Sequence, residues 1–216
     1  MESKEIVYRE LITRMEKDGC PICDFVEFRL AESLERFLYE GINTPHTRAT
    51  IEWTNGFCNR HAHRLAELGD PLSHAILYHD FMNTVIQDMS NSHSKTDHSM
   101  HAECFFCKIQ ASNDQDYTRA FLDFYENEDF ASRYEEKGIL CVPHLMRIKN
   151  VRFAKKKTVN RIAETTLEKY RALNHHLAEI KRKSDYRHVG EAWNEEEKEA
   201  WKKVVAIFNG APGICP

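Results

Sequence analysis

Six of the seven cysteines in this chain and two of its histidines form one spacing pattern that occurs twice. Each copy consists of a C-x-x-C pair followed, farther along the chain, by a C-x-x-H pair. The members are Cys20, Cys23, Cys58 and His61 in the first copy, and Cys104, Cys107, Cys141 and His144 in the second. Donors at positions i and i+3 lie on one side of a turn or helix start, as a four-coordinate metal or an iron–sulfur cluster requires. The pattern therefore predicts two Cys3His centres.

The donor set favours zinc without excluding other centres. Three thiolates and one neutral imidazole suit a divalent zinc ion, and the opening Cys20-Pro21-Ile22-Cys23 is typical of zinc knuckles. The same donors can hold a [4Fe-4S] cluster, and a reducible dithiol is a third possibility. We expect Zn2+ at both sites, with an iron–sulfur cluster as the alternative. Four protein donors would leave zinc no open position for a catalytic water.

Each ligand set is expected to come from a single copy, with crossed pairing as the alternative if the two halves exchange elements. Attachment of a c-type haem is disfavoured because Asp24 follows Cys23 and Lys108 follows Cys107, where histidine would be needed. A thioredoxin-like motif would need a βαβ context that this helical sequence does not offer.

The remaining reactive residues form no recognisable catalytic motif, which favours a protein that is not an enzyme without deciding the question. Cys215, in the C-terminal tail, is interpreted as a free thiol, and His63 as a residue beside the centre or in solvent. Three histidines in a polar segment, His93, His98 and His101, are weak candidates for a third metal site. No phosphate loop, dinucleotide fingerprint or nucleophile elbow is present, so no catalytic residue is predicted.

Hydrophobic periodicity predicts helices throughout the chain. They are expected over residues 3–17, 20–39, a short segment through 53, a segment at 58–61, 72–89, 155–181 and 194–208. Asn194 and Glu197 have the spacing of a capping box, and Gly210 supplies a stop. The expected fold is an all-α bundle with an internal pseudo-twofold duplication, each half held by one Cys3His centre.

The second copy repeats more than the ligands, because Phe37-Leu38 and Phe121-Leu122 stand at the same offset as the leading cysteines. This agreement supports an internal duplication. The expected division is a first repeat, a polar linker, a second repeat and C-terminal helices, at residues 1–90, 91–101, 102–153 and 154–216.

The composition and the lack of long apolar stretches indicate where in the cell the protein is located. The chain has 216 residues, 30% of them charged and 42% hydrophobic, with only 8 glycines and 6 prolines, which is typical of a helix-rich soluble protein. The N-terminus lacks the apolar stretch of a signal peptide, and no later run predicts membrane insertion. We therefore expect a cytoplasmic protein, in which paired cysteines favour metal over disulfides.

A basic stretch follows the second C-x-x-H pair. Residues 142–163 contain no acidic side chain, and the cations there are Arg147, Lys149, Arg152, Lys155, Lys156, Lys157 and Arg161. Such a surface could bind an acidic protein or a nucleic acid. A solvated helix face is the favoured interpretation, because the net charge of −4 lacks the basic excess of a nucleic-acid-binding protein.

The segments CPIC, NGFCNRHAHRL, CFFC and GILCVPHL, in this order, resemble an uncharacterised prokaryotic family known only as a domain of unknown function. The resemblance covers nearly the whole chain and implies the same eight ligand positions, but it brings no activity. The second copy has Ile139-Leu140 before its C-x-x-H pair, where the first has Gly56-Phe57. The leading hypothesis is a structural zinc protein that serves as a binding or adaptor module. The alternative is an iron–sulfur electron-transfer or redox protein.

Overall fold

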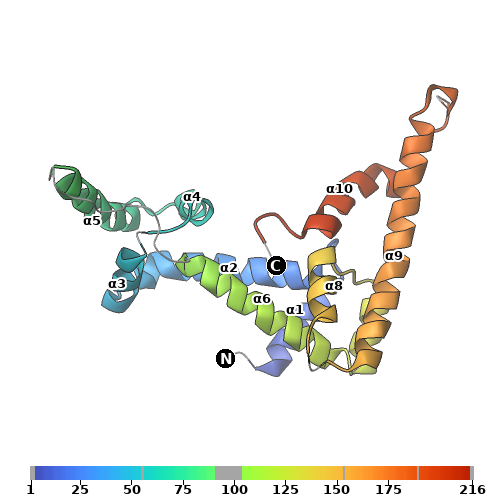
Figure 1. Cartoon of the computed structure of the whole chain (residues 1–216), viewed down its shortest axis with the longest axis horizontal. Coiled ribbons are helices and arrows are strands. Elements are labelled where there is room, and N and C mark those ends of the chain that lie inside the picture. Colours follow the sequence, from blue (N-terminus) through green and yellow to red (C-terminus); the bar gives the residue numbers. More distant parts are fainter. Residues whose placement is uncertain (1–2, 55, 91–103, 153, 189, 215–216) are drawn as a thin grey trace. The chain divides into compact units, whose positions relative to one another are not determined.

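The computed structural model describes residues 3–54, 56–90, 104–152, 154–188 and 190–214 (Figure 1). All regular secondary structure in these ranges is helical, which confirms the all-α prediction. No helix in the described ranges is both long and apolar enough to cross a membrane. The predicted linker at 91–101, its three histidines and Cys215 lie outside the described residues.

The chain forms two compact units that do not coincide with the two sequence copies. Unit 1 comprises residues 1–27 and 114–216, and unit 2 comprises residues 28–113. Each unit has its own hydrophobic core. Each unit therefore combines sequence from both copies, in contrast to the contiguous repeats expected from the spacing pattern.

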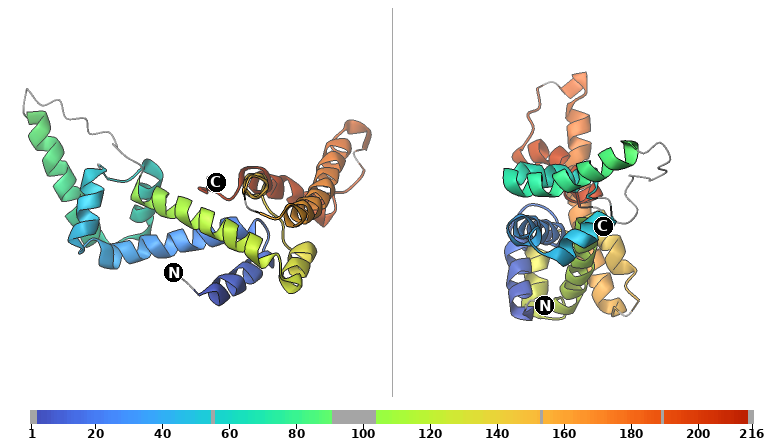
Figure 2. Two further views of the ribbon diagram at one scale, coloured as in Figure 1. Left: turned by 60° about the horizontal axis from the view of Figure 1, so that its bottom comes forward. Right: turned by 90° about the vertical axis from the view of Figure 1, so that its left-hand side faces the viewer.

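Unit 1 contains the N-terminal helix, part of two long helices and the C-terminal helices. These elements are α1 (Lys4–Met15), the start of α2 (Pro21–Arg36), the end of α6 (Phe105–Phe124), α7 (Glu128–Glu136), α8 (Val142–Lys149), α9 (Lys156–Lys183), η2 (Tyr186–His188) and α10 (Glu195–Asn209). Helix α10 packs on α8 and α9 (Figure 1), and α1 packs on α7, seen as dark blue beside yellow in Figure 2. The fully buried side chains of this core include Leu11, Ile22, Phe121, Phe130 and Ile148.

Unit 2 contains the remaining parts of the two long helices α2 and α6 and four elements that lie between them in the sequence. These are the end of α2, η1 (Phe37–Gly41), α3 (Pro45–Trp53), α4 (Asn59–Leu68), α5 (Pro71–Ser90) and the start of α6. The element η1 is a single π-helical turn that continues α2. The core is formed by residues such as Leu30, Leu34, Ile51, Leu65 and Phe106, none of them more than 1% exposed.

Helices α2 and α6 contact each other in an antiparallel sense. In unit 1, Phe25 near the start of α2 stacks on Tyr117 near the end of α6, with ring centroids 3.9 Å apart. In unit 2, Phe37 just after α2 meets Phe106 at the start of α6, edge to face at 5.5 Å. Such aromatic pairs add about 0.5–1.5 kcal/mol each beyond their buried area. The start of each long helix is thereby held beside the end of the other.

Local signals in the sequence position the last helix as predicted. Asn194 Oδ1 accepts a hydrogen bond from the Glu197 backbone N–H at 2.7 Å, and Glu197 Oε2 accepts one from the Asn194 N–H at 3.1 Å. This reciprocal pair is the predicted capping box, and it satisfies two N–H groups that the helix start would otherwise leave unpaired. Gly210 ends the helix with φ of 85°, a backbone conformation that favours glycine.

Candidate metal centres

The eight predicted ligands assemble into two groups, but each group takes one pair from each copy. The first centre consists of Cys20, Cys23, Cys141 and His144, and the second centre consists of Cys58, His61, Cys104 and Cys107. The expected pairing within each copy, which joined Cys20 and Cys23 to Cys58 and His61, is therefore wrong. The crossed alternative is the arrangement found, and each unit contains one complete group.

Helix length and direction explain the crossing. Helix α2 has 16 residues, and at 1.5 Å per residue its last residue lies about 20 Å from Cys23. There the following segment meets the start of α6, which places Cys58 near Cys104. Helix α6 has 20 residues and carries the chain about 30 Å in the opposite sense, back to the start of α2. Cys141 therefore lies beside Cys20 rather than beside Cys104.

All four ligand pairs occupy the same place on a helix. A cysteine directly precedes each of α2, α4, α6 and α8, and the second ligand is the third helical residue. The backbone carbonyls of Cys20, Cys58, Cys104 and Cys141 each accept the first helical hydrogen bond at 2.9–3.1 Å. Both donors of a pair thus project from the first turn, where the positive end of the helix dipole stabilises a thiolate.

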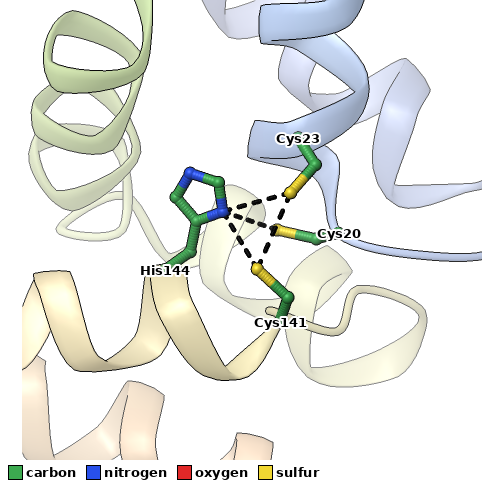
Figure 3. A group of neighbouring side chains, drawn as sticks. All are labelled: Cys20, Cys23, Cys141 and His144. Atoms are coloured by element: carbon green, nitrogen blue, oxygen red, sulfur yellow. Dashed lines mark hydrogen bonds between the residues drawn. The ribbon is translucent and has the colours of Figure 1, made fainter. Parts of the chain in front are cut away.

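The first centre is completely buried and compact (Figure 3). His144 Nδ1 lies 3.0 Å from Cys141 Sγ, 3.2 Å from Cys23 Sγ and 3.5 Å from Cys20 Sγ. Cys23 Sγ and Cys141 Sγ are 3.6 Å apart. Figure 3 shows the three sulfur atoms and Nδ1 directed toward one common point. The donors come from the starts of α2 and α8.

The second centre has the same donor arrangement. His61 Nδ1 lies 3.2 Å from Cys58 Sγ and 3.5 Å from both Cys104 Sγ and Cys107 Sγ. Cys58 Sγ and Cys107 Sγ are 3.8 Å apart. His61 and Cys104 are fully buried, whereas Cys58 and Cys107 remain partly exposed. The starts of α4 and α6 supply these donors.

Crowding of the donors shifts their protonation equilibria in the first centre. Burial opposes ionisation of Cys20, but hydrogen bonds from Cys141 and Cys23 and the charge of His144 hold its pKa well below the ordinary value. Hydrogen bonds with Cys141 and Cys20, together with burial, raise the pKa of Cys23. Several thiolates cannot share so small a buried volume without a cation to neutralise them. This donor chemistry fits a metal ion.

A buried carboxylate supports the histidine of the first centre. His144 Nε2 lies 2.5 Å from Asp114 Oδ1, and the Arg147 guanidinium pairs with the other carboxylate oxygen. Burial disfavours the imidazolium, but the charges and hydrogen bonds of Cys20 and Cys141 together outweigh it and raise the pKa of His144 to about 10. Such a carboxylate fixes the imidazole so that Nδ1 faces the metal.

Asp114 was not predicted as a functional residue from the sequence. Its position in the sequence could have indicated burial, because it stands three residues before Tyr117 and seven before Phe121, on the apolar face of α6. In the structure Asp114 is only 2% exposed. A carboxylate on the buried side of an amphipathic helix needs a partner, because burying an unpaired charge is costly.

The histidine of the second centre has a different neighbour. His61 Nε2 lies 3.2 Å from Arg60 Nη2, and Arg60 Nη2 donates to Gln110 Oε1 at 2.6 Å. Burial lowers the pKa of His61 to about 4, and the positive charges of Arg60 and Arg64 act in the same direction. Burial and the neighbouring Cys104 raise the pKa of Cys107 to about 12. The two centres therefore share their donors and differ in what surrounds them.

Among the described residues, His63, His74 and His79 belong to neither group. His63 is exposed, in agreement with the solvated alternative. His74 Nδ1 lies 2.9 Å from the Asp70 carbonyl oxygen of its own helix turn, and His79 is 73% exposed at its side chain.

The comparisons with known proteins identify relatives of unknown role. An uncharacterised 23.9 kDa protein encoded in the xynA 3' region of Caldicellulosiruptor sp. (strain Rt8B.4) is 28% identical over 208 residues, which cover 93% of this chain and 99% of that protein. No solved structure matches the chain. One family model matches twice, over residues 9–102 and 90–212, and the division between the matches agrees with an internal duplication. The chain therefore belongs to this family, which is described as a family of unknown function, DUF6062.

Proposed function

We propose that this protein binds two zinc ions in structural Cys3His centres and serves as a binding module rather than an enzyme. The observation that carries the proposal is the convergence of four soft donors in each group, with all donor atoms within 4.8 Å of one another. Thiolate and imidazole donors in this number and type suit zinc.

The distances support a single ion over a cluster. With Zn–S of about 2.3 Å and Zn–N of about 2.05 Å, tetrahedral geometry requires S···S of about 3.8 Å and S···N of about 3.5 Å. The Cys23–Cys141 and Cys58–Cys107 sulfur atoms are 3.6 and 3.8 Å apart, and the S···N distances are 3.0–3.5 Å. Donors to a [4Fe-4S] cluster bind different iron atoms and must stand farther apart than donors that share one ion.

The origin of the ligands supports a structural role. Each ion would join two helix starts that are far apart in the sequence, α2 with α8 in unit 1 and α4 with α6 in unit 2. Metal binding would then contribute directly to the free energy of folding. Four protein donors would complete the coordination, so a water molecule could not be activated at the metal.

The surface of unit 2 supports a binding role. Three apolar side chains of α5, Met82, Ile86 and Met89, stand on one helix face at spacing i, i+4 and i+7 and are 55–76% exposed. Large exposed apolar patches are uncommon on monomeric proteins and mark interaction surfaces. A photo-crosslinking residue at position 86, introduced in cells that naturally contain the protein, should give a discrete adduct. The same residue at exposed position 128 of α7 is the control, and equal adducts from both positions would contradict this role.

The basic stretch is a weaker candidate for a partner surface. Lys155 pairs with Glu126 at 2.6 Å, and Arg161 pairs with Glu128 at 2.9 Å and with Glu135 at 2.7 Å. Arg147 is engaged by the buried Asp114 already described. Three of the seven cations are thus paired with carboxylates of the same unit. This pairing reduces the positive electrostatic potential that an acidic partner would meet.

Metal analysis combined with spectroscopy tests the proposal. Protein purified anaerobically without added metal should be colourless and contain two zinc ions per chain, and chelator should lower its melting temperature. Visible charge-transfer absorption that bleaches with dithionite would instead establish the iron–sulfur alternative. Equal melting temperatures with and without bound metal would refute a structural role.

A further inference from the structure

We propose that the two centres have different roles: the first holds its ion permanently, whereas the second releases its ion when a peroxide oxidises Cys58 and Cys107. This inference rests on the proposed binding of zinc. It is carried by two independent differences between centres whose donor sets are otherwise the same.

The first difference is access. In the first centre every ligand is buried, and the most exposed of them, Cys20, shows only 6% of its surface. In the second centre Cys58 and Cys107 both retain part of their exposure. An oxidant or a chelator in solution can therefore approach these two sulfur atoms before it reaches any sulfur of the first centre.

The second difference is the group beyond the histidine. When Nδ1 binds a metal, Nε2 carries the proton and needs an acceptor. His144 finds one in the buried carboxylate of Asp114, at 2.5 Å. His61 instead faces a guanidinium nitrogen of Arg60, which is itself a donor, at 3.2 Å. A carboxylate strengthens imidazole as a ligand, and loss of such a partner weakens metal affinity about 10- to 100-fold.

The sulfur atoms of these two partly exposed cysteines are also close enough to form a bond after a small approach. Cys58 Sγ and Cys107 Sγ are 3.8 Å apart and must approach to about 2.05 Å in a disulfide. Cys23 Sγ and Cys141 Sγ of the first centre are comparably close, at 3.6 Å. The sulfur–sulfur distance therefore does not distinguish the two centres. They differ in solvent access and in the strength of the histidine ligand.

The reaction is a two-electron oxidation by a peroxide. One thiolate attacks the O–O bond and becomes a sulfenic acid, with departure of hydroxide, and the second thiolate then displaces the sulfenic oxygen to form the S–S bond. In total, two thiolates, one hydrogen peroxide and two protons give one disulfide and two water molecules. With Cys58 and Cys107 joined in a disulfide, only His61 and Cys104 would remain as donors, and the ion would leave as Zn2+.

Zinc release under hydrogen peroxide tests the inference. The protein is used as a Cys215→Ser variant, so that the terminal thiol does not react, and is first shown to contain two zinc ions. A colorimetric chelator should then report one ion released at least about tenfold faster than the other. Peptide mapping at that stage should show a Cys58–Cys107 disulfide and intact thiols at Cys20, Cys23 and Cys141. Release of both ions in one phase, or earlier oxidation of the first centre, would overturn the proposal.

A second variant tests the carboxylate without touching a ligand. Asp114→Asn should accelerate loss of the ion from the first centre about tenfold in chelator and leave the fast phase of the second centre unchanged. Asp116→Asn, at an exposed position of the same helix, is the matched control. Circular dichroism verifies that both variants remain helical. Unchanged release kinetics in a folded Asp114→Asn protein would show that this contact does not distinguish the centres. Protein isolated without zinc would instead refute the proposed function itself.

Discussion

The crossed arrangement of ligands makes a sharp prediction for the variant Cys141→Ser. The substitution removes one thiolate from the first centre, which also contains Cys20, Cys23 and His144. We expect the purified variant to contain one zinc ion instead of two. The ion of the second centre should remain, because none of its donors comes from α8.

The loss of stability can be bounded from the binding equilibrium. An ion present at 100 times its Kd stabilises the folded state by about 2.7 kcal/mol. At roughly 2–4 °C per kcal/mol for a chain of this size, the melting temperature should fall by roughly 5–11 °C. Structural zinc that binds more tightly would give a larger fall. The first transition to weaken should be that of unit 1, whose core includes Cys20, Cys23 and Cys141.

Quantitative alkylation identifies which thiols lose their protection. In Cys141→Ser, Cys20 and Cys23 should react rapidly with iodoacetamide, while Cys104 and Cys107 remain as slow as in the unsubstituted protein. The reciprocal variant Cys58→Ser should expose Cys104 and Cys107 and leave Cys20 and Cys23 protected. If Cys141→Ser exposes Cys104 and Cys107 instead, the ligands pair within each sequence copy and the reasoning from helix direction is refuted.

Three further substitutions test the local structure of unit 1, each by thermal or urea unfolding. Asn194→Ala removes the cap that pairs with Glu197 and should cost about 1 kcal/mol, and an unchanged midpoint would show that the capping box is not stabilising. Tyr134→Phe deletes the hydroxyl that accepts from the Leu140 N–H at 3.2 Å, leaving a buried donor unpaired at a cost of about 1–3 kcal/mol. In Gly138→Ala the new Cβ would lie 2.5 Å from Tyr134 Cδ2, so crowding should cost about 1–3 kcal/mol, and a stabilised variant would contradict that contact.

The ligand types and most helices could be predicted from the sequence because both depend on local spacing. A C-x-x-C or C-x-x-H pair needs only one helix start to bring its donors together, and all four pairs are found there. The helix predicted over 155–181 is α9 at Lys156–Lys183, and the one predicted over 194–208 is α10 at Glu195–Asn209. Short-range periodicity and capping residues were sufficient for these elements.

The sequence could not predict which C-x-x-C pair shares a centre with which C-x-x-H pair, because that depends on how the two long helices pack. The contacts of Phe25 with Tyr117 and of Phe37 with Phe106 set α2 and α6 antiparallel, and this direction exchanges the ligand pairs. Nothing in the spacing of cysteines encodes that contact.

The difference between the centres also belongs to the tertiary structure. Spacing alone makes the two donor sets equivalent, with three cysteines and one histidine in each. Only packing buries Asp114 against His144, turns Arg60 toward His61 and leaves Cys58 and Cys107 partly open. The sequence by itself determined which side chains can bind a metal, since donor chemistry and turn geometry are local. The fold decided which of them share an ion and how strongly each is held, since burial and the contacts of His144 with Asp114 and of Arg60 with Gln110 join residues distant in the chain.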